Sequence, residues 1–457
     1  MKQTIELRNL RTRNNSPEIK YYIKTFGCQM NEYDSEKISG LLESDGMEKV
    51  EDYENADIFF INTCTIRENA DNKLYGTLGE LKKWKNAQSN RKLIVGGCAS
   101  QKDKNLVREK APWVDVVLGT NNIGNLLNLI QYSNEKGPIT EIKENFTDSF
   151  SDIESVHNSS TTGMLTIQIG CNNNCTFCIV PTVRGNEKSR RPLEIFDDAI
   201  NLSQQGYKEI MLLGQNVNSY GRDLRINNKI SPYFIELLMM INEIDGVERI
   251  RFVSPHPKDV NINLIDLIDR NKKICNHIHL PLQSGSDEVL FEMKRGYTQK
   301  KFMSKVSMIN DTNNDISITS DIIVGFPGET ENDFIKTLEV VENAEFDSVF
   351  MYKFSARPGT IAETFYDRYV PADIIDHRFN RLKDLQTSIS NRRLSRFVHT
   401  YQEVLIEGPS KNNKNKSTGR TDNNNIVILD KIAEPGSIEK VFITKNTPFV
   451  LYGELIS

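Results

Sequence analysis

Three cysteines lie within a span of eight residues, directly after a short apolar run. The run covers residues 164–169, and Cys171, Cys175 and Cys178 follow it at Cys-x-x-x-Cys-x-x-Cys spacing. Three thiolates on one loop bind three corners of a 4Fe-4S cluster and leave the fourth iron open. An iron with an open position can bind a small molecule and transfer an electron to it. The loop therefore predicts a radical enzyme.

Zinc sites and disulfides are the other uses of closely spaced cysteines. A structural zinc site needs four ligands, and no fourth Cys or His follows Cys178 nearby. The chain has seven cysteines, an odd number, and we see no secretory signal before them. That pattern suits a reducing compartment, so we expect a cytoplasmic protein whose triad holds a cluster.

Three other cysteines occupy equivalent places in the first part of the chain. Between residues 21 and 120, short apolar runs alternate with helical stretches, which predicts a doubly wound parallel sheet. Cys28, Cys64 and Cys98 each end one of these runs. Because the carboxyl ends of parallel strands share one edge, the three thiols should converge there. Each thiol could instead fill the core, but their shared position favours a second cluster.

Composition describes a globular protein, with 38% hydrophobic and 26% charged residues over 457 positions. No apolar run approaches the roughly 20 residues of a membrane span, so we expect no membrane contact. The formal net charge of -5 argues against a uniformly cationic nucleic-acid binder. The stretch 391–457 nevertheless holds ten Lys or Arg and seven Asp or Glu, a local excess of positive charge compatible with RNA contact.

The middle of the chain alternates strand and helix six times. Residues 135–162, rich in Asn, Ser, Thr, Asp and Glu, have the composition of a linker before it. Six βα units fit an open, partial barrel, whose functional loops would follow the carboxyl ends of the strands. The candidate strands are 164–169, 209–214, 249–253, 277–282, 318–324 and 347–353.

Short β-like runs separated by Gly, Pro and Asn turns fill the last part of the chain, at 404–406, 426–429, 440–443 and 449–452. They predict a small antiparallel β-barrel of the oligonucleotide-binding kind. Residues 411–420 are expected to form a loop that either binds RNA or is simply solvated. Its basic residues are Lys411, Lys414, Lys416 and Arg420.

The motifs together make the chain resemble the radical S-adenosylmethionine methylthiotransferases over nearly its whole length. Within that family, five segments are similar to the branch that acts on isopentenyl-adenosine in tRNA. These are 27–35 (GCQMNEYDS), 62–67 (NTCTIR), 213–219 (LGQNVNS), 280–286 (LPLQSGS) and 321–330 (DIIVGFPGET). The resemblance implies two 4Fe-4S clusters, one on each cysteine triad, and S-adenosylmethionine as cofactor.

The resemblance also implies four regions: an extension over 1–18, an N-terminal domain with the auxiliary cluster over 19–136, a radical domain over 157–390, and an RNA-binding TRAM domain over 391–457. S-adenosylmethionine should chelate the open iron and be cleaved to a 5'-deoxyadenosyl radical. Loop residues at the barrel rim are expected to hold it: Phe177 and Gly325 at the adenine, Gly214, Gln215 and Asn216 at the methionine part, and Ser254 and Gln283 at ribose or carboxylate.

The expected substrate is isopentenyl-adenosine next to the anticodon, at position 37 of the tRNA, with the auxiliary cluster supplying the sulfur. Arg67, Arg184 and Arg357 are predicted to contact RNA phosphates together with the basic loop. An electron donor such as flavodoxin or ferredoxin and a monomeric state complete the picture. Two alternatives share the chemistry, with threonylcarbamoyl-adenosine in tRNA or a ribosomal-protein aspartate as target. A third, of another class, is a noncatalytic iron–sulfur protein that binds RNA, although a carrier needs no open iron.

Overall fold

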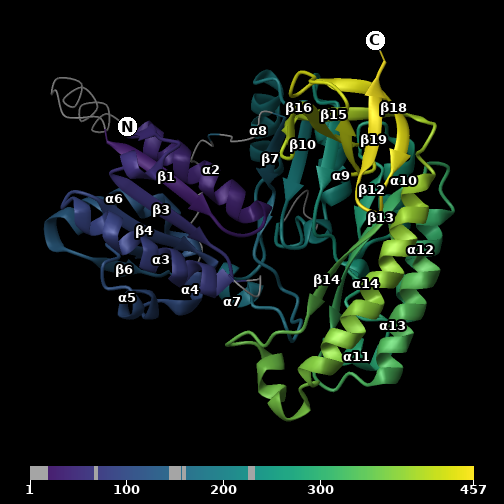
Figure 1. The fold of residues 1–457 in the computed structure, drawn as a ribbon, viewed down its shortest axis with the longest axis horizontal. Helices are drawn as coiled ribbons and strands as arrows, with labels where there is room; N and C mark the ends of the chain where they lie inside the picture. Colours follow the sequence, from purple (N-terminus) through teal and green to yellow (C-terminus); the bar gives the residue numbers. More distant parts are fainter. Residues whose placement is uncertain (1–18, 66–69, 144–155, 157–160, 225–231, 457) are drawn as a thin grey trace. The chain divides into compact units, whose positions relative to one another are not determined.

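The computed structural model describes residues 19–65, 70–143, 156, 161–224 and 232–456 (Figure 1). The chain divides into two compact units, Met1–Val156 and His157–Ser457. None of the described helices combines the length and the apolar composition of a membrane span.

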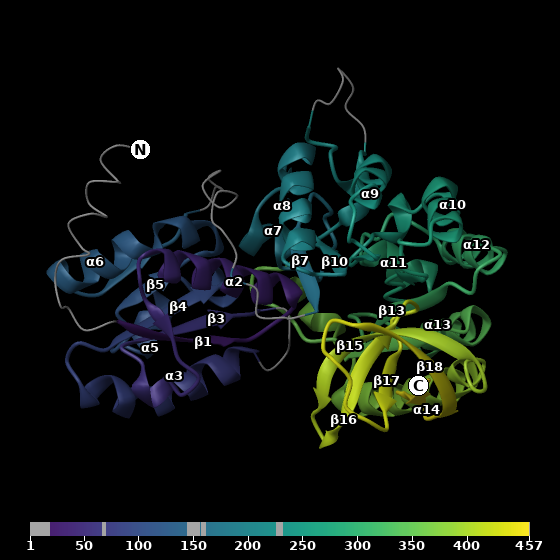
Figure 2. The ribbon, with the colours of Figure 1, turned by 90° about the horizontal axis from the view of Figure 1, so that it is seen from above.

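The first unit is a parallel sheet with helices on both faces, as the alternating pattern predicts. Its strand order is β2-β1-β3-β4-β5-β6. Figure 2 shows α2 and α6 on one side of the sheet and α3 and α5 on the other. The strands are β1 (Lys20–Thr25), β2 (Glu48–Lys49), β3 (Ile58–Thr63), β4 (Lys92–Gly97), β5 (Val116–Leu118) and β6 (Ile139–Glu141); the helices are α2 (Gln29–Ser44), α3 (Ala70–Ala87), α4 (Cys98–Asp103), α5 (Leu106–Lys110) and α6 (Leu126–Lys136).

Burial explains why this sheet forms. Every residue of β3 is buried, as expected for a central strand covered on both faces. Phe59 and Ile61 pack on the α3 side with Leu78 and Trp84. The linker prediction for residues 135–162 is wrong in part, because β6 pairs with β5 at the sheet edge. Three strand residues amid polar sequence give too short a hydrophobic pattern to detect.

The second unit contains the expected open barrel of six parallel strands. They form two sheets, β11-β10-β7 and β12-β13-β14, joined by a parallel bridge between Ile250 and Ile274. The strands are β7 (Thr162–Thr166), β10 (Glu209–Leu213), β11 (Arg249–Phe252), β12 (His277–His279), β13 (Ser317–Val324) and β14 (Ser348–Lys353). The prediction of this architecture from the βα pattern is confirmed.

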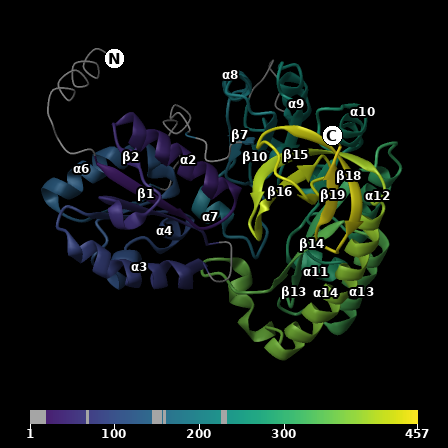
Figure 3. The ribbon, with the colours of Figure 1, turned by 45° about the horizontal axis from the view of Figure 1, so that its top comes forward.

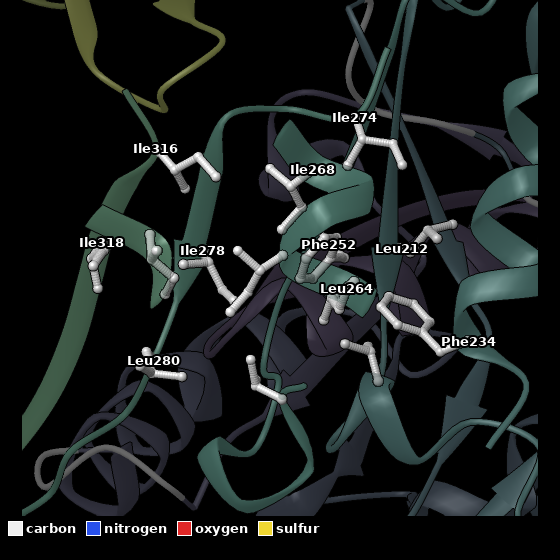
Figure 4. Packing of buried hydrophobic residues seen from close by; sticks show 14 of the residues in the cluster. Leu212, Phe234, Phe252, Leu264, Ile268, Ile274, Ile278, Leu280, Ile316 and Ile318 are labelled. Atoms are coloured by element: carbon white, nitrogen blue, oxygen red, sulfur yellow. The ribbon is translucent and has the colours of Figure 1, made fainter. Parts of the chain in front are cut away.

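Helices cover the outer face of the open barrel. They are α8 (Pro192–Gln204), α9 (Phe234–Asn242), α10 (Ile262–Arg270), α11 (Asp287–Glu292), α12 (Gln299–Asn310), α13 (Glu331–Ala344) and α14 (Ala372–Ser395). A short helix, α7 (Val180–Arg184), and a small pair of strands, β8 (Gln168–Ile169) and β9 (Lys188–Ser189), flank the first cysteine loop. Figure 4 shows Leu212, Phe252 and Ile278 of the strands packed with Leu264 and Ile268 of α10.

The C-terminal strands close into a five-stranded barrel in the order β15-β16-β17-β19-β18. They are β15 (Tyr401–Ser410), β16 (Asn413–Thr421), β17 (Ile426–Leu429), β18 (Ile438–Asn446) and β19 (Leu451–Leu455). The expected small barrel is therefore present, but it is not purely antiparallel, because β17 and β19 pair in parallel.

The predicted loop at 411–420 is wrong, since most of it is strand β16 and only residues 411–412 form a turn. The buried positions of β16 hold Ser417, Gly419 and Thr421 in place of apolar side chains. Gly419 is required there, because a Cβ atom would lie 2.5 Å from the Leu405 carbonyl oxygen. Small inward residues hide the strand from a hydrophobic-pattern search.

The small barrel docks on the amino ends of the central strands, beside them in Figure 3. Arg249 donates to the carbonyl oxygens of Arg420 and Glu403 at 2.9 and 2.8 Å, and Arg251 donates to those of Thr421 and Asp422 at 3.2 Å each. The opposite, carboxyl-end loops of the central strands thus stay clear of this interface.

A buried ion pair supports that docking interface. Arg251 and Glu209 lie 3.0 Å apart, and each side chain is only 2% exposed. Burial alone would raise the pKa of the Glu209 carboxyl, but the Arg251 guanidinium outweighs it and holds that pKa below its usual value. Removing one partner would leave the other charge buried and unpaired, which typically costs about 3–5 kcal/mol.

Candidate functional site

The first cysteine triad lies on a tightly held loop between β8 and α7. The loop opens at Gly170, whose φ of +76° favours glycine and whose Cβ would lie 2.1 Å from the Asn186 carbonyl oxygen. Thr176, between the second and third cysteines, donates its amide to the Met293 carbonyl at 3.1 Å and accepts from the Ala362 amide at 2.8 Å. These bonds fix the loop to segments more than 100 residues away in sequence.

The three thiols share a partly buried environment. Burial raises the pKa of the Cys171 thiol, and it raises that of Cys178 to about 12, with the neighbouring Cys175 and Cys171 adding to the effect. Such thiols stay protonated at neutral pH until a metal centre replaces the proton. A metal centre bound at this loop would therefore displace the protons of Cys171 and Cys178.

Hydrogen-bond donors reach all three sulfurs, and the donor to Cys178 is the backbone amide of Val180. The backbone and side-chain nitrogens of Asn173 each lie 3.4 Å from Sγ of Cys171. Nη1 of Arg295 lies 3.3 Å from Sγ of Cys175. Arg295 is buried and held by the Tyr297 hydroxyl and the Pro281 carbonyl oxygen, at 3.1 and 3.2 Å. Donors to ligand sulfurs tune the potential of iron–sulfur clusters. Arg295 was missed from the sequence, because only the fold brings it to the loop.

This donor set fits an iron–sulfur cluster better than a single ion. Among the residues that the structure describes, no three Cys, His, Asp or Glu side chains are arranged to hold one metal ion. A cubane cluster makes a different demand, since each thiolate binds its own iron. Three thiols on one rigid loop, with donors aimed at their sulfurs, meet that demand.

The residues predicted to hold S-adenosylmethionine all follow the carboxyl ends of the central strands. Gly214 follows β10, Ser254 lies beyond β11, Gln283 beyond β12, and Gly325 directly follows β13. Ser254 and Gln283 have φ of 60° and 70°, a left-handed conformation that costs non-glycine residues about 1–3 kcal/mol. Backbone strain of this kind concentrates at functional sites.

The same residues differ in how well they could bind a ligand. Oε1 of Gln215 is buried and has no hydrogen-bond partner among the described residues, so a ligand could satisfy it. Asn216 is already engaged, accepting from the His256 amide and donating to Asp259, both at 3.1 Å. Gly325 must be glycine, because a Cβ would lie 2.4 Å from Ile375. Phe177 packs against an apolar cluster of Val289, Met293, Phe326 and Ala362, which anchors the cysteine loop. Cofactor contacts of all these residues stay predictions.

The second triad lies at the carboxyl ends of three adjacent strands. Cys28 follows β1 and is the N-cap residue of α2, Cys64 follows β3, and Cys98 follows β4 and begins α4. The parallel register pairs Thr25 with Asn62 and Thr63 with Gly97. The topology therefore brings the three cysteines to one edge of the sheet, as the strand pattern predicts.

Two asparagines hold the loops of this edge together. Nδ2 of Asn31 donates to the Thr63 carbonyl oxygen at 2.9 Å, and Nδ2 of Asn62 donates to the Asn31 carbonyl oxygen at 2.8 Å. A Cβ on Gly27 would lie 2.9 Å from Cβ of Cys64, so the Cys64 side chain packs against the residue before Cys28. Residue type alone does not distinguish Asn31 and Asn62, although both stand inside the cysteine motifs at 27–35 and 62–67.

The predicted RNA contacts have unequal access to solvent. Arg67 lies outside the described residues. Arg184 is only 4% exposed and Arg357 is half-buried, so an RNA contact for either stays a prediction. Lys411 and Lys414 are exposed at the β15–β16 hairpin, and Lys416 is half-buried. Arg420 donates to Oε1 of Glu407 at 2.8 Å and to Asn424, which neutralises its charge locally.

Three family models match successive parts of the chain. Residues 20–119 match the uncharacterized protein family UPF0004, residues 165–341 the radical SAM superfamily, and residues 395–456 the TRAM domain. The ranges contain strands β1 to β5 of the first sheet, the central barrel strands up to β13, and the C-terminal barrel.

Solved structures share the fold at low sequence identity. The radical S-adenosylmethionine methyltransferase TsrM from Kitasatospora setae superposes with a TM-score of 0.56 at 14% identity, covering 76% of this chain and 77% of that one. The cobalamin-dependent radical enzyme OxsB gives 0.54 at 12% identity, over 81% of this chain and 57% of that one. These matches support the architecture alone.

Curated relatives are much closer in sequence. A protein of Clostridium botulinum (strain Okra / Type B1) named tRNA-2-methylthio-N(6)-dimethylallyladenosine synthase is 44% identical over 96% of this chain and 97% of its own length. A protein of the same name from Corynebacterium urealyticum is 42% identical over 95% of this chain and 82% of its own. Identity at this level along nearly the whole length shows that the chain belongs to the family of tRNA-2-methylthio-N(6)-dimethylallyladenosine synthases, within the radical S-adenosylmethionine methylthiotransferases.

Proposed function

We propose that the protein methylthiolates isopentenyl-adenosine at position 37 of tRNA, using S-adenosylmethionine and two 4Fe-4S clusters. The observation that carries the proposal is the presence of two cysteine triads, each at the carboxyl edge of parallel strands, in a chain so similar to enzymes of that name. We further propose that it works as a cytoplasmic monomer with a small electron-transfer protein as reductant.

The chain's own residues would divide the work between the two units. Cys171, Cys175 and Cys178 would hold the radical cluster, which when bound supplies the electron that cleaves S-adenosylmethionine to a radical able to attack an aromatic carbon–hydrogen bond. Arg295 and Asn173 donate to the sulfurs and so keep the thiolates charged and oriented. The strained Ser254 and Gln283 would orient the cofactor, together with Gln215, whose Oε1 has no partner among the described residues.

Cys28, Cys64 and Cys98 would hold the auxiliary cluster that carries the transferred sulfur. Cys28 lies at the N-terminus of α2, where the helix dipole places partial positive charge. Asn31 and Asn62 keep the loops of that edge in register. Without a rigid edge, three thiols from separate strands would not meet one cluster.

The function is tested by nucleoside mass spectrometry. The anaerobically reconstituted protein, given S-adenosylmethionine, a reductant and tRNA that carries isopentenyl-adenosine, should form the 2-methylthio derivative. Transfer RNA from a strain without the gene should contain isopentenyl-adenosine and lack that derivative. Product on threonylcarbamoyl-adenosine or on a ribosomal protein, with none on isopentenyl-adenosine, would replace the proposal with one of the alternative targets.

The lysines of the β15–β16 hairpin give a separate prediction about RNA binding. Changing Lys411, Lys414 and Lys416 to Gln should make the salt dependence of tRNA affinity shallower, by about 0.7–0.9 in the log–log slope per lost phosphate contact. Arg420 is left unchanged because Glu407 already pairs with it. Affinity is measured over a salt series.

A matched control replaces three exposed lysines of the central domain, Lys272, Lys300 and Lys301, with Gln. Equal slopes for wild type and hairpin variant would exclude the hairpin from the RNA interface.

A further inference from the structure

The inner face of the last three central strands carries polar and aromatic side chains that the proposed chemistry has not used. Side chains alternate between the two faces of a strand. In β13, Ile318, Ile322 and Val324 belong to the core packed under the helices. Thr319 and Asp321, at the intervening positions, therefore point to the opposite face, which is the inside of the open barrel.

A hydrogen-bonded chain runs along this inner face. Nδ1 of His279 lies 3.0 Å from the Thr319 hydroxyl, and Nε2 of His279 lies 3.1 Å from Oδ2 of Asp321. The His279 and Asp321 side chains are 16% and 25% exposed, so the pair is accessible. No described residue donates to Oδ1 of Asp321, which leaves one carboxylate oxygen able to accept a hydrogen bond.

An exposed aromatic ring lies beside this pair. Phe350 of β14 stands directly opposite Asp321 in the parallel register. Its ring centroid is 6.0 Å from that of His279, and 54% of the residue is exposed. The neighbours of Phe350 along β14, Val349 and Met351, pack with the helix-covered core. A large apolar ring that the fold leaves uncovered beside a carboxylate suits a flat ligand with a hydrogen-bond donor on its edge.

The inner face leads to the first cysteine loop. Ile323, two residues beyond Asp321 and about 7 Å along the strand, packs on the same apolar cluster as Phe177. Pro281, two residues beyond His279, accepts from Arg295, which in turn donates to Cys175. A ligand on Phe350 and Asp321 would therefore lie on the strand face that leads, through Ile323 and Pro281, to the cysteine loop.

We propose that Phe350 and the Asp321–His279 pair form the subsite for the base of the substrate nucleoside. Phe350 stacks on the purine ring, and Oδ1 of Asp321 accepts the single N–H that an N6-alkylated adenine retains, while His279 fixes the carboxylate. Enzymes that act on a base take it out of the stack into such a pocket of ring and edge contacts. The inference rests on the proposed function, because it takes the substrate to be an N6-alkylated adenosine.

The test compares two anticodon stem-loop RNAs that differ only at the target position. One carries isopentenyl-adenosine and the other an abasic nucleotide, and the affinity of the reconstituted holoenzyme for each is measured at equilibrium. Wild type should bind the first more tightly. Phe350→Ala should reduce this preference by about 5- to 150-fold, the range expected for loss of one base–aromatic stack. Asp321→Asn, which keeps the side-chain shape and removes the charge, should reduce it less.

A matched control separates the subsite from a general loss of exposed aromatic surface. Phe291 is 81% exposed on α11, in the helical layer, and Phe291→Ala should keep the wild-type preference. Iron and sulfide content and circular dichroism show whether each variant is folded and loaded. In steady-state assays, Phe350→Ala should raise KM for the modified stem-loop more than it lowers kcat.

The outcomes distinguish the subsite from the reaction. Equal affinity of wild type for the two RNAs, or an unchanged preference in both Phe350→Ala and Asp321→Asn, would overturn the subsite even where methylthiolated product forms. A preference that depends on Phe350, without any product from isopentenyl-adenosine, would leave the subsite standing and overturn the proposed reaction.

Discussion

Replacing Cys171, Cys175 and Cys178 together with Ala should abolish cleavage of S-adenosylmethionine and remove about half of the bound iron. The reconstituted wild type should hold about eight iron atoms per chain, four in each cluster, and the variant about four. Cleavage should fail because the variant has no thiol left on this loop to hold the cluster whose open iron binds the cofactor. Iron and sulfide analysis and chromatographic detection of 5'-deoxyadenosine measure the two effects.

Cys275 provides the control for this variant. It is a buried cysteine before β12, and burial raises the pKa of its thiol far above the usual range. Cys275→Ala should therefore keep wild-type iron content and cleavage. If the Cys171/Cys175/Cys178 variant still formed 5'-deoxyadenosine, the radical centre would have to lie elsewhere, and the assignment of the loop would be wrong.

The central strands and the two cysteine triads could be predicted because each depends on a short, local stretch of sequence. Each central strand is a short apolar run followed by a helical stretch, so all six could be identified and ordered. The two cysteine triads can be recognised for the same reason. Cys28, Cys64 and Cys98 each follow an apolar run, and Cys171, Cys175 and Cys178 share one loop after such a run. The expected convergence of Cys28, Cys64 and Cys98 needed only the rule that parallel strands end at one edge.

The missed features depend on contacts between distant residues. Strand β16 has inward Ser417, Gly419 and Thr421, and only pairing with β15 and β17 makes it a strand. Arg420, whose RNA contact stays a prediction, pairs with Glu407 across that ladder, and the sequence pattern does not reveal this partner. Arg295 reaches Cys175 from 120 residues away. Hydrophobic periodicity carries no information about which distant groups will meet, so such partners appear only when the chain is folded.

The left-handed Ser254 and Gln283 show the same limit at the predicted cofactor site. Their place after strands, as polar groups near the rim, is what the sequence predicts of them. Nothing in their residue type signals a positive φ, which in non-glycine residues is uncommon. The surrounding bonds impose it: the Gln283 amide donates to the Asp321 carbonyl at 2.8 Å, and its carbonyl accepts from Ile323 at 3.0 Å. The positive φ angles of these residues arise only in the folded barrel, so they could not be predicted from the sequence.

Replacing Cys28, Cys64 and Cys98 with Ala should have the opposite pattern of effects. The variant should lose the other half of the iron, keep cleavage of S-adenosylmethionine, and form no methylthiolated nucleoside. The separation is expected because the two triads belong to different compact units of the chain. Nucleoside mass spectrometry of the tRNA and 5'-deoxyadenosine analysis of the same reaction mixture give both readouts at once.

Loss of folding in the first unit is the competing explanation, because Cys64 and Cys98 are each 1% exposed. A second variant with Ser at the three positions keeps side-chain volume near that of Cys, and circular dichroism reports the helices of the unit. Full iron content in either folded variant would refute the auxiliary cluster. A variant with half the iron and normal methylthiolation would place the sulfur source outside this triad. A sheet edge without thiols cannot hold the cluster that is proposed to carry the transferred sulfur.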